Sequence, residues 1–343
     1  MRAVVAHGPN DLRFDKLEIP QAGPGQVTVR VVYGGICGSD LHYARMGRNG
    51  IYEIDEPLIL GHEVSGVVLT DASGSVPEGT PVAIHPATPT PEAGTPRGSG
   101  LNLSIGGTYL GSASTSPHTQ GGFAEYLVVD KAQLRPLPET LPLRRSVLAE
   151  PLAVAIHAVG LLEERIPGAR VLVSGSGPIG AFATAALREV GAAHITAADL
   201  HEVPLETARA LGADETVRLG IDAPLNEDSF DVVVEAAGVV PSLNTALRTV
   251  RRGGAVLQLG MLPAGDLTLP LAAFVSKEVL LQGTQRFDSE FDEAIELLVK
   301  RPQIEEAISH EFPFQSAAKA FAIAEDSAAS AKVILSISPD PQR

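Results

Sequence analysis

The chain has 343 residues, 44% of them hydrophobic and 20% charged, and a formal net charge of −15. Its length exceeds the usual size of one hydrophobic core and predicts two domains, while the acidic balance excludes broad contact with nucleic acid or anionic membranes. A single cysteine excludes an intramolecular disulfide and fits a reducing cytoplasm. No apolar run has the length of a signal peptide or a membrane span. We therefore expect a cytoplasmic globular enzyme or binding protein.

Short β runs separated by turn residues dominate residues 1–150, as in "VTVRVVY" at 27–33, "VSGVVLT" at 64–70 and "FAEYLVVD" at 123–130. This pattern indicates a compact, mostly β domain with long loops. Residues 85–120 are rich in Pro, Gly, Ser and Thr and have no hydrophobic period. They are expected to form a surface lobe.

The rhythm changes after Pro151. Six apolar runs, among them "ARVLVSG" and "FDVVVEAAG", alternate with Ala- and Leu-rich stretches of helical period. This alternation predicts an α/β domain with a doubly wound parallel sheet. After residue 286 the pattern changes to helices and the closing run "AKVILSIS". We expect one domain to comprise residues 1–150 and 287–343, and the other to comprise residues 151–286.

A glycine-rich turn follows the run "RVLVS" and precedes a helical stretch. In this Gly-x-Gly-x-x-Gly pattern, Gly175 permits a tight turn, Gly177 permits the backbone to approach a pyrophosphate, and Gly180 permits close packing of helix on strand. Asp199 ends the next strand, where a carboxylate binds ribose hydroxyls and repels a 2′-phosphate, which favours NAD over NADP. The predicted cofactor-binding residues are Gly175, Gly177, Pro178, Ile179, Gly180 and Asp199.

Zinc-ligating residue types occur in three further segments: Cys37 in "GGICGSDLHY", His62 and Glu63 in "LGHEVSG", and Glu150 in "AEPLAVAIHA". Zinc binds thiolate, imidazole and carboxylate groups, and a catalytic site leaves one position open. Each residue also has an ordinary structural interpretation: a lone cysteine is commonly a small buried hydrophobe. The spacing by itself does not establish that the four residues converge.

The ordered set "GGICGSDLHY", "GHEVSG", "GGFAEY", "EPLAVAIHA" and "GSGPIG" resembles the zinc-dependent medium-chain dehydrogenases, in their polyol (sorbitol-type) branch. Within that branch the motifs and the late "QRFDSEF" are most similar to the L-idonate 5-dehydrogenases. The resemblance implies a GroES-like, mostly β catalytic domain joined to a Rossmann domain that binds NAD.

The resemblance also implies a metal site. Cys37, His62 and Glu63 match the family's zinc ligands, and Glu150 matches a catalytic carboxylate that holds the metal directly or through water. Asp40 matches an acid that orients the zinc-bound imidazole, the usual task of an outer-sphere carboxylate. We expect one catalytic zinc per chain.

Four more residues match positions around the family's substrate. Ser39 and His42 match a relay that carries the substrate proton to solvent. Tyr43 and Arg286 match positions that contact polyol hydroxyls. Arg286 lies at the expected junction of the two domains, so an interdomain salt bridge is an equally good interpretation of this residue.

Many relatives carry four clustered cysteines that hold a structural zinc, whereas the stretch after His85 has none, so no structural zinc is expected. The predicted activity is the NAD-linked oxidation of a secondary alcohol of a sugar acid or polyol to a ketone, with L-idonate as the favoured substrate. The alternatives are a sorbitol, xylitol or galactitol dehydrogenase, a threonine-type dehydrogenase, a zinc-free reductase and a non-catalytic NAD-binding protein. The family implies a homodimer or homotetramer.

Overall fold

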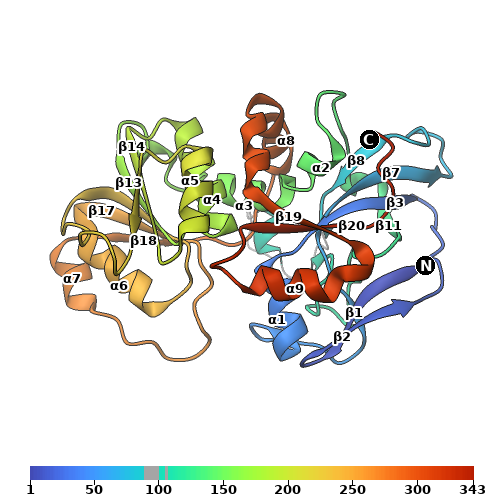
Figure 1. Ribbon diagram of the computed structural model, residues 1–343, viewed down its shortest axis with the longest axis horizontal. Coiled ribbons are helices and arrows are strands. Elements are labelled where there is room, and N and C mark those ends of the chain that lie inside the picture. Colours follow the sequence, from blue (N-terminus) through green and yellow to red (C-terminus); the bar gives the residue numbers. More distant parts are fainter. Residues whose placement is uncertain (89–99, 105–106) are drawn as a thin grey trace.

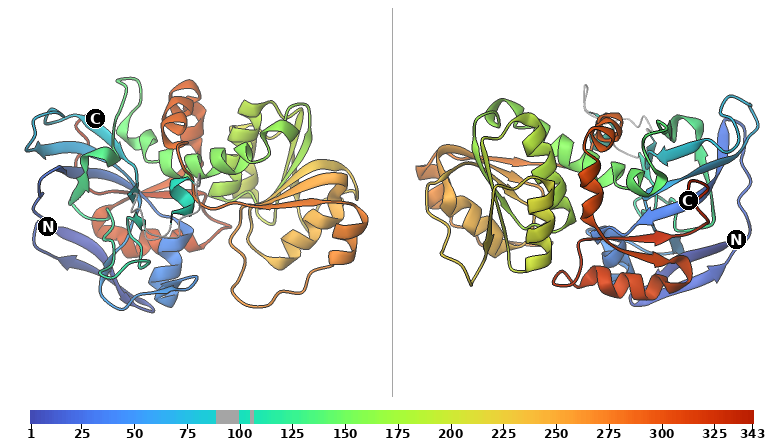
Figure 2. Two further views of the ribbon diagram at one scale, coloured as in Figure 1. Left: turned by 180° about the vertical axis from the view of Figure 1, so that it is seen from behind. Right: turned by 45° about the horizontal axis from the view of Figure 1, so that its top comes forward.

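The structure, a computed structural model, describes residues 1–88, 100–104 and 107–343. The chain forms two units side by side along its long axis (Figure 1). Both termini lie in the unit that contains β1 and β3, although the chain passes through the other unit between them. The view from behind and the tilted view in Figure 2 show the same division.

A seven-stranded sheet forms the core of the N-terminal unit, in the order β12-β8-β7-β3-β20-β19, with β11 also paired to β3. Its strands are β3 (Gln26–Gly35), β7 (Glu63–Asp71), β8 (Pro81–Ile84), β11 (Tyr126–Asp130), β12 (Leu134–Pro136), β19 (Ile308–Pro313) and β20 (Lys332–Ser336). A second sheet contains β1 (Arg2–Gly8), β2 (Asp11–Lys16) and β6 (Leu58–Ile59). The short strands are β4 (Arg48–Asn49), β5 (Tyr52–Glu53), β9 (Ala87–Thr88) and β10 (Thr108–Tyr109). This is the mostly β, GroES-like domain expected from the sequence.

The C-terminal strands complete the first sheet. β20 pairs antiparallel with β3, with Leu335 opposite Gly34, and pairs parallel with β19. The helix α9 (Ala317–Glu325) connects β19 to β20 and packs against both. Residues more than 290 positions apart in the sequence thus share one sheet, and β20 brings its side chains to the end of β3.

The other unit contains a six-stranded parallel sheet in the order β15-β14-β13-β16-β17-β18. Alternate residues of β13 face two separate cores: Val171 and Val173 pack with α4, and Leu172 packs with α6. Helices therefore cover both faces, which confirms the doubly wound Rossmann architecture. The strands are β13 (Arg170–Ser174), β14 (His194–Asp199), β15 (Glu215–Arg218), β16 (Phe230–Glu235), β17 (Val250–Gln258) and β18 (Leu280–Gly283). The helices are α4 (Pro178–Val190), α5 (Glu202–Leu211), α6 (Val240–Thr249) and α7 (Leu271–Ser276).

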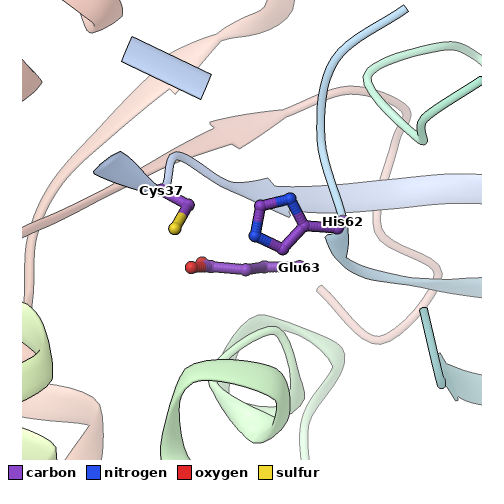
Figure 3. Close-up of side chains that lie close together, drawn as sticks. All are labelled: Cys37, His62 and Glu63. Carbon is purple, nitrogen blue, oxygen red and sulfur yellow. The ribbon is translucent and has the colours of Figure 1, made fainter. Parts of the chain in front are cut away.

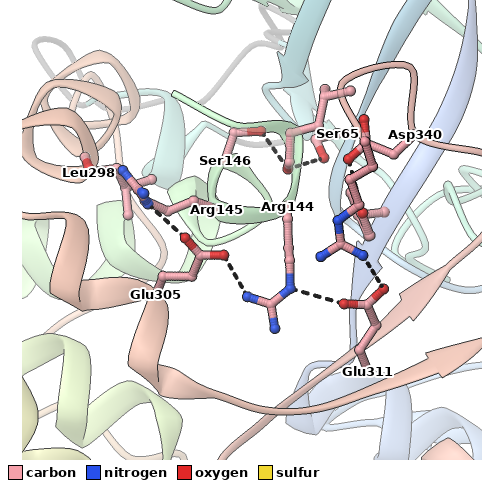
Figure 4. Close-up of polar contacts among 11 residues, drawn as sticks. Ser65, Arg144, Arg145, Ser146, Leu298, Glu305, Glu311 and Asp340 are labelled. Atoms are coloured by element: carbon pink, nitrogen blue, oxygen red, sulfur yellow. Dashed lines mark hydrogen bonds and ion pairs between the residues drawn. The ribbon is translucent and has the colours of Figure 1, made fainter. Parts of the chain in front are cut away.

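The helices α2 (Leu143–Ser146), α3 (Ala149–Gly160) and α8 (Phe291–Lys300) lie where the two units meet (Figure 1). Arg144 of α2 forms ion pairs with Glu305 and Glu311, and Arg145 pairs with Glu305 (Figure 4). These ion pairs link the segment through which the chain leaves the N-terminal unit to the segment through which it returns. The helix α3 runs across residue 150, so no break in secondary structure marks that position. The domain boundaries predicted at residues 150 and 287 stay a prediction.

Short 3₁₀ helices complete the fold: η1 (Leu101–Leu103), η2 (Lys131–Gln133), η3 (Glu163–Arg165), η4 (Pro302–Ala307) and η5 (Phe314–Ser316). Within the described ranges, no helix combines the length and the apolar character needed to cross a membrane. Of the predicted lobe, residues 89–99 and 105–106 lie outside the described residues. Its described part contains the antiparallel pair β9–β10 and η1.

Candidate metal centre and cofactor site

Cys37, His62 and Glu63 form a group of three possible metal donors whose ligand atoms all lie within 4.8 Å of one another. In Figure 3 the cysteine sulfur, the imidazole and the carboxylate gather around one small space. Strand pairing explains the meeting, because Gly35 at the end of β3 pairs with Glu63 at the start of β7. Cys37 follows two residues later, as the N-cap of α1 (Gly38–Met46).

Two glycines make room for this group. A Cβ atom on Gly35 would lie 2.1 Å from the Glu63 carboxylate, and one on Gly61 would lie 2.3 Å from the ring of Phe123. Gly61 also has a φ of 95°, a left-handed conformation that favours glycine. The glycines of "GGICGSDLHY" and "GHEVSG" therefore have a packing reason.

Asp40 fixes both segments that carry the donors. Its fully buried carboxylate accepts the backbone N–H of Cys37 and that of Gly61, each at 3.0 Å. Burial raises the pKa of Asp40, against the nearby charge of His62. The distance from Asp40 Oδ1 to His62 Nδ1 is 4.0 Å, so the direct hydrogen bonds of this carboxylate go to the flanking backbone.

A buried lysine lies behind the donors. Lys332 of β20 donates to both oxygens of Glu63, at 2.7 and 2.8 Å, and to the carbonyl of Ile36 at 3.1 Å. Burial alone would lower the pKa of Lys332, but the negative charges of Glu63 and Cys37 raise it. Sequence reasoning missed this residue, although a lysine within the apolar run "AKVILSIS" was an available signal.

Glu150 is buried in the first turn of α3 and is not a member of the three-donor group. The hydroxyl of Tyr109, on β10, donates a hydrogen bond to its carboxylate. Burial raises the pKa of Glu150, and the charge of Glu63 adds to this effect. Tyr109 also lies with its ring centroid 5.6 Å from that of His62. Sequence reasoning missed Tyr109, the only aromatic residue between Pro86 and Gly122 apart from His118.

The electrostatics of the group suit a cation. Burial would lower the pKa of His62, but the charges of Cys37, Asp40 and Glu150 raise it to about 10. This shift reports a strongly negative potential in a space from which water is largely excluded. A thiolate, an imidazole and a carboxylate are the donors that zinc takes in proteins, so these residues fit a zinc ion.

Arg286 contacts Tyr109, whose ring lies next to that of His62. Its guanidinium carbon is 4.0 Å from the centroid of the Tyr109 ring, which is a cation–π distance. Its backbone adopts the left-handed region, with a φ of 48°. Among the residues that the structure describes, Arg286 forms no ion pair, so the interdomain salt bridge is not found there.

The predicted relay residues lie on α1. Ser39 is half-buried near the start of the helix, and His42, one turn later, is exposed with Nδ1 3.2 Å from the Asn49 side-chain oxygen. Tyr43 is buried, and its hydroxyl accepts the N–H of Ala113 at 3.0 Å. Contact of Tyr43 with a substrate stays a prediction.

The glycine-rich turn has the geometry that its pattern predicts. Gly175 has a φ of 92°, and a Cβ on Gly180 would lie 2.0 Å from the carbonyl oxygen of Gly175. Gly177 is the N-cap of α4, followed by Pro178 at the first helical position, and no atom lies within 4 Å of where its Cβ would be. The open space at Gly177, in front of a helix N-terminus, fits a pyrophosphate. Ile179 occupies the first turn of α4.

Asp199 ends β14 next to this turn. One carboxylate oxygen accepts the N–H of Ser176 at 2.8 Å, and the other accepts the N–H of His201 at 3.0 Å. These bonds hold a negative charge at the carboxyl edge of the parallel sheet, where dinucleotide riboses bind in this fold.

Comparison with known proteins assigns the family. Residues 23–139 match the "Alcohol dehydrogenase GroES-like domain" family and residues 178–300 match the "Zinc-binding dehydrogenase" family. The chain is 37% identical to L-idonate 5-dehydrogenase (NAD(P)(+)) of Escherichia coli over 320 residues, which cover 90% of each protein. It is 34% identical to sorbitol dehydrogenase of Gallus gallus, over 93% of this chain and 92% of the relative. The crystal structure of the Escherichia coli L-idonate 5-dehydrogenase superimposes with a TM-score of 0.90 at 34% identity and covers 98% of both chains. The chain therefore belongs to the zinc-binding medium-chain dehydrogenases, in the sorbitol dehydrogenase branch, and is an oxidoreductase that acts on CH–OH groups.

Proposed function

We propose that the protein oxidises a secondary alcohol of a sugar acid or polyol to a ketone, with zinc at Cys37, His62 and Glu63 and with NAD as hydride acceptor. The observation that carries this proposal is the convergence of three zinc-type donors within 4.8 Å. They come from two distant segments of one fold that also holds a dinucleotide turn. A zinc ion bound there would supply Lewis acidity toward a hydroxyl, as it does when it lowers the pKa of bound water to about 7.

The residues around the donors have distinct tasks in this proposal. Asp40 holds the backbones of Cys37 and Gly61 at a fixed separation through two hydrogen bonds. Glu150, oriented by the Tyr109 hydroxyl, supplies a further carboxylate that acts on the metal directly or through water. Such support keeps a catalytic group in place, because it restricts the rotamers of the ligands.

The proton path follows α1. Ser39 is half-buried near Cys37 and accepts the proton that leaves the substrate hydroxyl, and His42, exposed one helical turn later, passes it to solvent. Imidazole suits this task because one ring nitrogen can accept a proton while the other donates one. A His42→Ala variant is expected to lower turnover.

NAD is the proposed cofactor. The carboxylate of Asp199 accepts ribose hydroxyls in this fold and repels a 2′-phosphate, and its two backbone hydrogen bonds keep it at the sheet edge. The Escherichia coli relative carries the name NAD(P)(+), so the preference needs its own measurement. A kcat/KM higher with NADP than with NAD would contradict the assignment.

L-idonate is the proposed substrate, in line with the name of the Escherichia coli relative. Arg286 supports a sugar acid, because its guanidinium has no ion-pair partner among the described residues and lies over Tyr109, whose ring is next to that of His62. A guanidinium binds a carboxylate through two parallel hydrogen bonds. Neutral polyols such as sorbitol, xylitol and galactitol are the alternative substrates, supported by the sorbitol dehydrogenase relative.

A substrate panel separates these candidates. Turnover with NAD is measured on L-idonate, sorbitol, xylitol, galactitol and threonine, and zinc is determined on the same sample. Fastest turnover of L-idonate supports the proposal, fastest turnover of a polyol or threonine selects the corresponding alternative, and bound zinc without any turnover indicates a non-catalytic homologue. Arg286→Ala is expected to raise KM for L-idonate far more than KM for sorbitol. Arg45→Ala, which removes an exposed arginine of α1, is the matched control. The proposed assembly, a homodimer or homotetramer, is tested by light scattering.

A further inference from the structure

The segment that carries Arg286 is held in place by the described part of the cysteine-free lobe. The 3₁₀ helix η1 (Leu101–Leu103), the short teal helix between the two units in Figure 2, lies beside this segment. The side chain of Asn102 donates to the carbonyl of Gln285 at 2.9 Å, and this carbonyl belongs to the peptide bond that precedes Arg286. Asp288 accepts the N–H of Leu101 at 2.5 Å.

A second contact of Asn102 leads into α3. Its side-chain nitrogen lies 3.2 Å from Nε2 of His157, whose Nδ1 lies 2.8 Å from the carboxylate of Glu290. The neutral tautomer with its proton on Nδ1 satisfies both contacts. The two N–H groups of the Asn102 amide then have two acceptors, and Glu290 also accepts the N–H of Asp288 at 2.7 Å.

The backbone held by these contacts is strained. Arg286 has a φ of 48°, a left-handed conformation that is unfavourable for a residue with a Cβ and persists only where the surrounding structure imposes it. The surroundings do so on both sides: Asn102 binds the preceding carbonyl, and Phe287 is buried between His85 and Phe291. In this conformation the guanidinium lies over Tyr109.

We infer that Asn102 is a positioning residue: with His157 it holds the Gln285 carbonyl, keeps Arg286 in its left-handed conformation, and so aims the guanidinium at the substrate. The inference rests on the proposed function, in which Arg286 binds the substrate. The inference also gives the cysteine-free lobe a role in positioning Arg286. The lobe supplies Tyr109, whose ring lies against the guanidinium, and Asn102, which binds the carbonyl that precedes Arg286.

Two variants test the positioning role. Asn102→Ala removes the donor, and Asn102→Asp keeps the shape but sets a carboxylate against the Gln285 carbonyl. For the fastest substrate of the panel, we expect both variants to raise KM by about tenfold, the effect of one hydrogen bond of ordinary net strength. The kcat and the KM for NAD are expected to stay near the wild-type values. Leu103→Ala, which truncates an exposed side chain of the same turn, is the control and is expected to leave all three constants unchanged.

A double variant and a structural readout complete the test. In the Arg286→Ala background, Asn102→Ala is expected to add no further rise in KM, and hydrogen exchange in peptides covering residues 284–290 is expected to accelerate in Asn102→Ala alone. An unchanged KM, or parallel changes in kcat and in the KM for NAD, overturns the inference. If Arg286→Ala itself leaves KM unchanged, the substrate contact and the inference both fail. Faster hydrogen exchange in Asn102→Ala would then show that Asn102 does hold the backbone of this segment, and that the error lies in the proposed contact between Arg286 and the substrate.

Discussion

Lys332→Met removes the positive charge behind the metal donors. Lys332 donates to both oxygens of Glu63, at 2.7 and 2.8 Å, and their side chains are 2% and 0% exposed. Methionine has a similar length and no charge, so the variant keeps most of the packing. Glu63 then remains as a buried carboxylate without its cation, and the carbonyl of Ile36 loses a donor.

The size of the effect follows from this burial. Removal of one partner from a buried ion pair costs about 3–5 kcal/mol, because the remaining charge stays desolvated. We expect a loss of this size in the unfolding free energy of the metal-free protein. In the zinc-loaded protein the metal charge compensates Glu63, so the loss is expected to be smaller.

Urea unfolding, followed by circular dichroism on chelator-treated and zinc-loaded protein, measures both values. Lys300→Met is the matched control, because Lys300 pairs with Glu189 at the surface with 65% of its side chain exposed, and such pairs contribute about 0–1 kcal/mol. In metal-free protein, Glu63→Gln combined with Lys332→Met is expected to recover part of the loss. A loss no larger than that of Lys300→Met, or the same loss with and without zinc, would refute the reasoning.

Substitutions at Glu305, at the glycines of the cofactor turn and at Tyr109 have distinct expected effects. Burial raises the pKa of Glu305, but hydrogen bonds and charges from two arginines of α2 outweigh it and lower this pKa. The ionised Glu305 therefore stabilises the fold above its unfolded pKa of about 4.3, and this stabilisation is lost as pH falls through the lower folded pKa. Glu305→Gln should therefore reduce the fall in unfolding free energy below about pH 5. Urea unfolding at a series of pH values measures this, and the same fall as in the wild type would count against the prediction. Gly177→Ala should weaken NADH binding without loss of stability, because its Cβ meets no protein atom. Gly180→Ala should lower both NADH affinity and stability, because its Cβ would lie 2.0 Å from a carbonyl oxygen. Fluorescence titration measures the affinity and thermal unfolding measures the stability, and equal effects of the two variants would contradict the geometry. Tyr109→Phe leaves a buried oxygen of Glu150 without its donor and should lower the unfolding free energy by about 1–3 kcal/mol. Urea unfolding measures this loss, and a variant as stable as the wild type would show that the hydrogen bond contributes nothing.

Local patterns predicted the fold and the cofactor turn because they report local physics. Apolar runs of strand length and helical stretches between them require a doubly wound sheet, and glycines at residues 175, 177 and 180 act within one strand-turn-helix unit. Asp199 was predictable for the same reason, since it ends the next strand. The family resemblance supplied the donors Cys37 and His62, whose meeting depends on the pairing of β3 with β7.

The residues that the sequence did not reveal act across large separations. Lys332 reaches Glu63 only because β20 returns beside β3, 269 positions away in the chain. Tyr109 reaches Glu150 from a lobe without hydrophobic period, and Asn102 reaches Gln285 over 183 positions. No local pattern encodes these partners, because each depends on tertiary packing of segments with no shared periodicity.

Metal content, measured by elemental analysis on the wild type and on Cys37→Ala, tests the central claim most directly. The account predicts about one zinc per chain in the wild type, as expected for a catalytic site with three protein ligands, and loss of both zinc and NAD-linked alcohol oxidation in Cys37→Ala. Full zinc content and wild-type turnover in Cys37→Ala would contradict it, as would an active wild-type protein that contains no zinc.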